Sequence, residues 1–159
     1  MNELRELIQS MKLRSRTGLA VGLSVPEDMK AYMGGEWREI RAADAFQYQD
    51  GQFSVVVMAG TALNAKSAKE AHRVLKDGGY LLFTVPERTS SQFGFTLADI
   101  YSIVREGYNI TVVKRPAWWR FGRGGKTLTI CAQKKSWKVY KGFKREGAFC
   151  LSPFHNAKI

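Results

Sequence analysis

A cluster of aromatic and basic residues in the last third of the chain has the chemistry of a nucleic-acid contact. Trp118 and Trp119 stand next to Arg120, and Arg123 and Lys126 follow within a glycine-rich stretch. Aromatic rings stack on bases, and cationic side chains neutralise phosphates. The pattern therefore predicts a surface for nucleic acid or another polyanion. In the alternative interpretation, the rings close the hydrophobic core at a sheet edge and the lysines protect that edge from aggregation.

The distribution of charge supports a basic surface that is confined to one part of the chain. The sequence has 159 residues and a formal net charge of +11, with 25 Lys and Arg against 14 Asp and Glu. Residues 101–159 contain 13 of the basic side chains and only two acidic ones, whereas residues 1–100 are balanced. Such asymmetry indicates a basic face or arm on an otherwise neutral fold.

No set of residues typical of acid–base, nucleophilic or metal chemistry stands out. His72 lies near the apolar stripe of a predicted helix, where we expect a packed side chain and not a catalytic base. Cys131 and Cys150 are too few for a disulfide framework or a zinc cage, and they form no Cys-x-x-Cys pattern. We therefore expect no structural metal.

Length and hydropathy predict a single globular domain over residues 1–159. The longest apolar runs are strand-length, far short of the roughly 18 residues that a membrane span needs. The first residues are unlike a secretory signal, because acidic and basic side chains precede any apolar run. We expect a cytoplasmic protein with no membrane partner.

The order of the helix and strand patterns predicts an α/β fold. Apolar spacing favours helices, one of which carries the stripe Ala68, Ala71, Val74 and Leu75 and ends at Asp77-Gly78-Gly79. Ser24-x-x-Glu27 is typical of a capping box at the start of another. About six strands are expected, near residues 19–23, 38–42, 53–58, 80–85, 110–115 and 126–132. Alternating strands and helices imply a mostly parallel sheet with helices on both faces. We expect the last strand to be antiparallel.

Residues 43–57 and 70–86 resemble the second half of a class I S-adenosylmethionine-dependent methyltransferase. The HRVLK-x-GG-x-LL string and the β-branched strand before it carry the match, and later elements keep the family's order. The resemblance covers about residues 36–132 and implies a Rossmann-like methyltransferase fold. It divides the domain into an atypical part (1–35), a family-like core (36–132) and a basic C-terminal extension (133–159).

The resemblance implies S-adenosylmethionine as the cofactor, bound at the carboxyl ends of the central strands. Asp44 matches the acidic residue that accepts a hydrogen bond from the adenine amino group, with Ala45 beside it and Phe46 flanking the base. The residues that follow the family's fourth strand and line the methyl-donor site are Ala59, Gly60 and Thr61. In the alternative interpretation, Asp44 is only a helix or turn cap, and Ala59 and Gly60 form a tight turn.

Two features of the family's cofactor site are missing upstream. In the family, a Gly-x-Gly-x-Gly loop after the first strand lets backbone N–H groups approach the methionine moiety, whereas Gly18 and Gly22 have a different spacing. The family's second strand ends in a carboxylate that holds the ribose, and the matching string has Gly22 there, so Glu27 or Asp28 would have to substitute. One strand–helix unit of the family is missing. Either the chain lacks the family's first strand and its glycine loop, or residues 18–23 are that first strand and the family's second strand–helix unit is absent.

These departures predict a methyltransferase-like protein with an incomplete cofactor site and weak or absent methyl transfer. Each charge-assisted hydrogen bond that is lost removes roughly 1.5–3 kcal/mol of binding free energy. A protein partner or a homodimer that completes the site would restore an active transferase. The other interpretation is a non-catalytic nucleic-acid- or protein-binding module that uses the basic C-terminal third.

Overall fold

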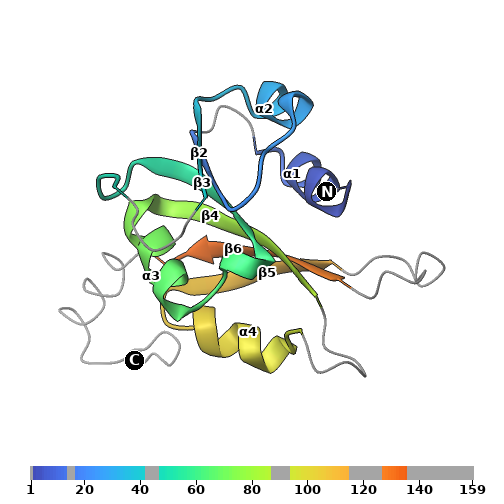
Figure 1. Cartoon of the computed structure of the whole chain (residues 1–159), viewed down its shortest axis with the longest axis vertical. Coiled ribbons are helices and arrows are strands. Elements are labelled where there is room, and N and C mark those ends of the chain that lie inside the picture. Colours follow the sequence, from blue (N-terminus) through green and yellow to red (C-terminus); the bar gives the residue numbers. More distant parts are fainter. Residues whose placement is uncertain (1, 14–16, 42–46, 87–93, 115–126, 136–159) are drawn as a thin grey trace, which may run out of the picture.

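The computed structural model describes residues 2–13, 17–41, 47–86, 94–114 and 127–135. Their strands form a six-stranded sheet in the order β2-β1-β3-β4-β6-β5 (Figure 1). The strands are β1 (Gly18–Val21), β2 (Trp37–Ile40), β3 (Phe53–Ala59), β4 (Leu75–Pro86), β5 (Tyr108–Lys114) and β6 (Thr127–Lys134). The helices are α1 (Asn2–Ser10), α2 (Glu27–Met33), α3 (Ala65–Val74) and α4 (Leu97–Val104), with a 3-10 turn at Gly60–Ala62.

The sheet is mostly parallel. β1 pairs in parallel with both β2 and β3, and β3 pairs in parallel with β4. β6 is antiparallel to its two neighbours, β4 and β5. The β-branched run of β3 lies inside the sheet, where both of its faces are covered. The predicted α/β fold, its six strands and its antiparallel last strand are confirmed.

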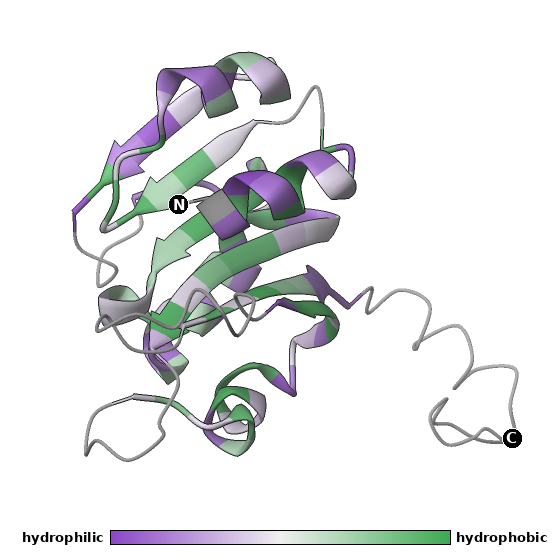
Figure 2. Ribbon diagram, turned by 90° about the vertical axis from the view of Figure 1, so that its right-hand side faces the viewer, coloured by the Kyte–Doolittle hydropathy of each residue, from purple (hydrophilic) through white to green (hydrophobic). Residues whose placement is uncertain are grey.

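Helices cover both faces of the sheet, so the apolar strands lie in the middle layer (Figure 2). On one face, α1 and α2 pack over side chains such as Val55 and Val57. On the other face, α3 and α4 pack over Val56 and Met58. This alternation follows from the two-residue period of a strand, which sends successive side chains to opposite faces.

Two local predictions were wrong. Ser24 does not cap α2, because the residue before that helix is Pro26 and no side-chain cap bond is formed. Leu75 does not belong to the preceding helix but begins β4, where it pairs with Phe53. Gly78 adopts a φ of +76°, which glycine tolerates, and so allows a turn near the start of β4. This turn lies within the span of β4, whereas the sequence predicted it at the end of the helix.

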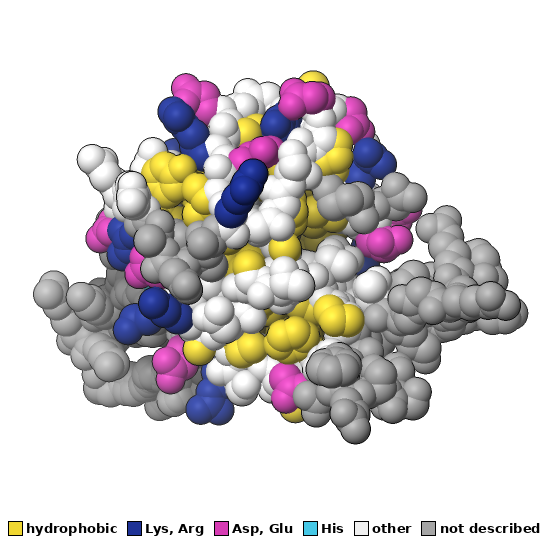
Figure 3. Space-filling view, in the orientation of Figure 1, with side chains coloured by type: hydrophobic (Ala, Val, Ile, Leu, Met, Phe, Trp, Pro, Cys, Tyr) yellow, Lys and Arg dark blue, Asp and Glu magenta, His cyan; other side chains and the backbone are white. Residues whose placement is uncertain are grey.

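The surface around α1 and α2 carries interspersed basic and acidic side chains (Figure 3). Arg5 of α1 forms an ion pair with Asp28 of α2 at 2.9 Å, and Lys30 of α2 pairs with Glu27 at 3.0 Å. The first pair connects α1 to α2, the second lies within α2, and together they neutralise this part of the surface. Among the described helices, none is both long enough and apolar enough to cross a bilayer.

Candidate functional site at the carboxyl ends of the parallel strands

The strand order reverses at β1. Its chain neighbour β2 lies on one side, whereas β3, the next strand along the chain, lies on the other. In open α/β sheets, ligands bind in the crevice outside the carboxyl ends of the strands at such a point. The candidate site is therefore built from the residues that follow Val21, Ile40 and Ala59.

Gly22 lies where these three strand ends meet. Its N–H donates to the carbonyl oxygen of Ile40 at 2.8 Å, and it adopts a φ of +74°. A Cβ atom there would be 3.3 Å from the Cβ of Ala59 and 3.5 Å from that of Ala62. A pocket of about 480 Å³ opens beside it. The pocket is lined by Gly22, Leu23, Ser24, Glu39, Ile40 and Arg41.

Glu39 of β2 contacts the loop that follows β1. Its carboxylate accepts hydrogen bonds from the Val25 N–H at 3.1 Å and from the Ser24 hydroxyl at 3.3 Å, and it pairs with Lys30 Nζ at 3.1 Å. The hydrogen bond from Lys30, and then that from Val25, hold the pKa of Glu39 below its ordinary value. Among the described residues, Glu39 is thus the carboxylate that lines this pocket. The sequence analysis missed it, because it considered only Glu27 and Asp28 as substitutes for the family's carboxylate.

The two carboxylates considered instead lie on α2. Glu27 pairs with Lys30, and Asp28 pairs with Arg5 of α1. Neither lines the pocket beside Gly22. An acidic residue near the end of an edge strand was the available signal for Glu39, but only the pairing of β2 with β1 brings it to the loop.

The predicted residues after β3 lie at the same edge. Ala59 ends β3, Gly60 begins the 3-10 turn, and Thr61 is exposed. A Cβ on Gly60 would collide with the carbonyl oxygen of Thr84 and lie 3.1 Å from the Cα of Val85. The missing side chain of Gly60 therefore lets the turn pack against β4.

Several predicted site residues lie outside the described residues. The adenine-binding candidates Asp44, Ala45 and Phe46 follow Arg41 in the sequence. The basic and aromatic candidates fall between Lys114 of β5 and Thr127 of β6, and Thr127 pairs with Pro86 at the carboxyl end of β4. The segment that contains them therefore joins the sheet at the same edge as the pocket. These candidates are Trp118, Trp119, Arg120, Arg123 and Lys126.

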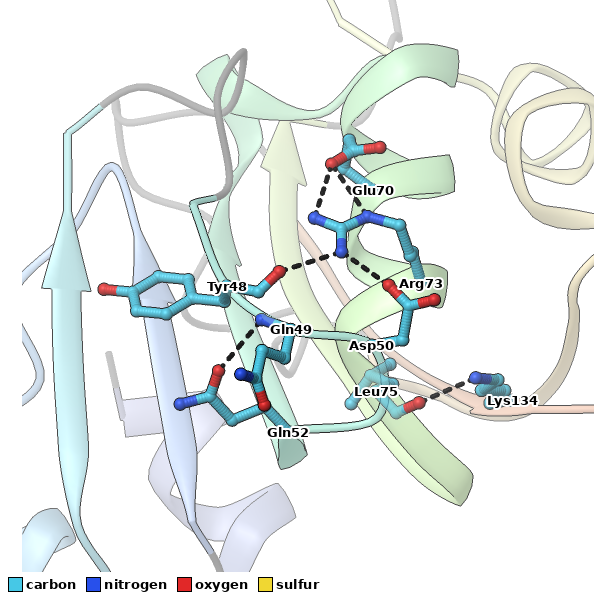
Figure 4. A network of polar contacts seen from close by, with 8 residues as sticks. All are labelled: Tyr48, Gln49, Asp50, Gln52, Glu70, Arg73, Leu75 and Lys134. Atoms are coloured by element: carbon cyan, nitrogen blue, oxygen red, sulfur yellow. Dashed lines mark hydrogen bonds and ion pairs between the residues drawn. The ribbon is translucent and has the colours of Figure 1, made fainter.

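A charged network lies at the other end of the parallel strands, near their amino ends (Figure 4). Arg73 of α3 donates to the carbonyl oxygen of Tyr48 at 2.8 Å and pairs with Asp50 at 2.7 Å and Glu70 at 3.0 Å. Lys134 donates to the carbonyl oxygen of Leu75 at 2.6 Å. These contacts hold the turn before β3 against α3 and β4, which gives the network a structural role.

Three lysines of the basic third are engaged by the fold. The side chain of Lys134 is only 10% exposed, Lys114 pairs with Glu6 at 3.7 Å, and Lys135 donates to the carbonyl oxygen of Arg105 at 2.7 Å. Nine of the 13 basic residues between positions 101 and 159 lie outside the described part of the chain. Any polyanion surface would have to draw mainly on those nine.

A groove of about 620 Å³ separates α3 from α4 and the start of β5, and His72 lines it. The imidazole packs edge-to-face on Tyr108 with ring centroids 5.4 Å apart, as expected for a packed helix residue. Its Nε2 has no hydrogen-bond partner in the part of the chain that the structure describes. Burial, and then the charge of Lys134, lower the pKa of His72.

The lowered pKa of His72 predicts that stability falls on mild acidification. Below about pH 6.5 the unfolded chain takes up this proton more readily than the folded chain, so the free energy of unfolding decreases as pH falls. One such group contributes at most about 1.4 kcal/mol per pH unit, and a half-buried ring contributes less. Urea unfolding between pH 7.5 and 5.5 should show this slope.

His72→Gln should flatten the pH slope, and His155→Gln, the matched control, should leave it unchanged. Asp28 and Glu39 have pKa values below their ordinary range, so they titrate below this window. An unaltered slope in His72→Gln would contradict the assignment.

Comparisons with known proteins place the fold. Neither a protein-family model nor a curated protein sequence matches the chain. Among solved structures, it is similar to an S-adenosylmethionine-dependent methyltransferase from Aquifex aeolicus (15% identity, TM-score 0.59), with 83% of this chain and 89% of that chain covered. It is also similar to one from Methanosarcina mazei (14% identity, TM-score 0.57), with 81% and 97% covered.

A third similar structure contains a ligand. It is the 1,6-didemethyltoxoflavin-N1-methyltransferase of Burkholderia thailandensis with bound 1,6-didemethyltoxoflavin and S-adenosylhomocysteine. The identity is 13% and the TM-score 0.61, with 84% of this chain and 77% of that chain covered. At these identities the similarity concerns the fold, and the chain has the Rossmann-like fold of S-adenosylmethionine-dependent methyltransferases.

Proposed function

We propose that this chain is a methyltransferase-like domain whose incomplete cofactor site binds S-adenosylmethionine weakly or not at all, so that methyl transfer is weak or absent. The observation that carries the proposal is the contact of Glu39 with the loop after β1. The Val25 N–H, a donor of that loop, already bonds to a carboxylate of the protein itself. The same contact engages Ser24 and Lys30.

The residues present fit an adenosyl ligand only in part. Gly22 lies at the reversal of strand order, and Ala59 at the end of β3 and Ala62 of the following turn stand across from it. Gly22 stands at the end of β1, where the resemblance expects the ribose-binding carboxylate, and Arg41, a cation, lines the same pocket from the end of β2. Loss of two charge-assisted hydrogen bonds weakens binding by roughly 10²- to 10⁴-fold.

Asp44→Ala tests whether the remaining affinity is of the adenosyl type. We expect S-adenosylhomocysteine to raise the melting temperature slightly at millimolar concentration, since stabilisation grows with ligand concentration relative to Kd. Asp44→Ala should abolish this increase because it removes the predicted adenine contact. Asp77→Ala, which removes an exposed carboxylate at the opposite edge of the sheet, should leave it unchanged.

Two outcomes would argue against the proposal. A shift that survives in Asp44→Ala would place the ligand elsewhere. A shift that grows with protein concentration would instead favour a second chain that completes the site. The second case would support the active-transferase alternative.

The second candidate function is binding of nucleic acid or another polyanion. Its support is the charge asymmetry, because the whole excess of +11 falls in residues 101–159. The segment with Trp118, Trp119 and Arg120 also joins the sheet at the edge that carries the pocket. Binding of a polyanion by this segment does not require methyl transfer, so this function is compatible with an incomplete cofactor site.

A further inference from the structure

Three donors from one short stretch converge on a single carboxylate. The Val25 N–H, the Ser24 hydroxyl and Lys30 Nζ all lie within 3.1 to 3.3 Å of the Glu39 carboxylate oxygens. A backbone N–H, a hydroxyl and an ammonium group around one point form a cradle for a carboxylate. The donors come from the loop after β1 and from α2, whereas the acceptor comes from a different strand.

We infer that Ser24, Val25 and Lys30 form a binding site for the carboxylate of a small ligand, and that Glu39 occupies this site when the ligand is absent. Glu39 competes with the ligand from within the chain. A ligand carboxylate enters by displacing the Glu39 side chain toward solvent.

The position of Glu39 makes such an exchange feasible. It lies on β2, the edge strand, and its side chain is 36% exposed. Glu39 and Ser24 both line the 480 Å³ pocket, so a ligand in that pocket reaches the donors directly. Lys30 also pairs with Glu27, which keeps its ammonium group in place after Glu39 leaves.

Competition makes a prediction about affinity. In the unsubstituted chain, a ligand carboxylate gains the three donors only by releasing Glu39, so the exchange is nearly balanced. Glu39→Gln removes the competing charge and leaves the donors. The gain in affinity should be about tenfold or more, the equivalent of one charge-assisted hydrogen bond.

Acetate is the first probe, because it carries a carboxylate and nothing else. Its titration is followed by the NMR signal of the Val25 amide in the full chain. We expect a saturating shift in Glu39→Gln at acetate concentrations that leave the unsubstituted chain unchanged. Glu39→Ala removes the competing group altogether and should show the same gain, so the test does not depend on one variant folding.

The controls separate this site from a general effect of charge. Asp28→Asn also converts a paired carboxylate of this region into an amide, but outside the pocket, and should give no gain. Lys30→Met in the Glu39→Gln background should reverse the gain. Equal responses of Glu39→Gln, Asp28→Asn and the unsubstituted chain would overturn the inference, as would a shift that is not centred on residues 24–30.

The identity of the ligand, but not the site, rests on the proposed function. S-adenosylhomocysteine carries an amino-acid carboxylate, and 5′-methylthioadenosine lacks it. We expect Glu39→Gln to strengthen binding of the first compound by about tenfold and of the second not at all. If acetate responds while neither nucleoside binds, the carboxylate site stands and takes a different carboxylate ligand, and the proposed function stands as well. If the unsubstituted chain binds S-adenosylhomocysteine in the low micromolar range, the proposed function fails, whatever Glu39→Gln does. If Glu39→Gln changes the binding of neither acetate nor S-adenosylhomocysteine, the inference fails.

Discussion

Replacing Gly60 by Ala should lower the free energy of unfolding by about 2–3 kcal/mol. The added Cβ would collide with the carbonyl oxygen of Thr84 and lie 3.1 Å from the Cα of Val85. Both atoms belong to the backbone of β4, which is held between β3 and β6 and cannot move aside. Urea unfolding of the purified chain measures the loss directly.

Gly34→Ala is the matched control, because it adds the same methyl group where nothing lies within 4 Å. Gly34 adopts a φ of +66° at the end of α2, so its cost is backbone strain of roughly 1 kcal/mol. A Gly60→Ala variant as stable as Gly34→Ala would contradict the close packing of the turn on β4. It would also support the alternative that Gly60 lacks a side chain in order to leave room for a ligand.

Replacing Arg120, Arg123 and Lys126 together by Ala should weaken the salt dependence of nucleic-acid binding. The slope of log affinity plotted against log salt concentration should become less steep by roughly two. Each phosphate that a cation neutralises contributes about 0.7 to 0.9 to this slope. Filter binding with single-stranded RNA at several salt concentrations measures it. The affinity at low salt should fall together with the slope.

Two further variants distinguish a binding surface from a structural role of the rings. Lys66, Lys69 and Lys76, all exposed, replaced together by Ala remove the same charge from another surface and should leave the slope unchanged. Trp119→Ala should weaken binding with little change in slope if the ring stacks on a base. A large loss of thermal stability in Trp119→Ala, without detectable RNA binding by the unsubstituted chain at low salt, would show that the aromatic residues only close the core.

The fold was predictable because its signals are local. A β-branched run such as that of β3 indicates a strand covered on both faces, and the alternation of helix and strand patterns indicates a parallel sheet. Leu75 was misplaced because its apolar side chain continues the stripe of α3, and only the pairing with Phe53 assigns it to β4. Local periodicity cannot detect that pairing.

The site was predictable only in part because its contacts are nonlocal. Ser24 has the spacing of a capping residue, yet its hydroxyl donates to Glu39, 15 residues later in the chain. That contact requires β2 to lie beside β1 in a register that aligns Glu39 with Ala20. Gly60 has the sequence appearance of a ligand-binding glycine, whereas its neighbours in β4 explain it by packing.

Calorimetric titration of the full chain with S-adenosylhomocysteine tests the central claim most directly. The incomplete site predicts no saturation in the micromolar range, because the loop after β1 has its Val25 N–H bonded to Glu39 and Gly22 stands where the resemblance expects the ribose-binding carboxylate. A dissociation constant in the low micromolar range for the unsubstituted chain, abolished by Asp44→Ala, would contradict this account and identify the chain as a competent methyltransferase.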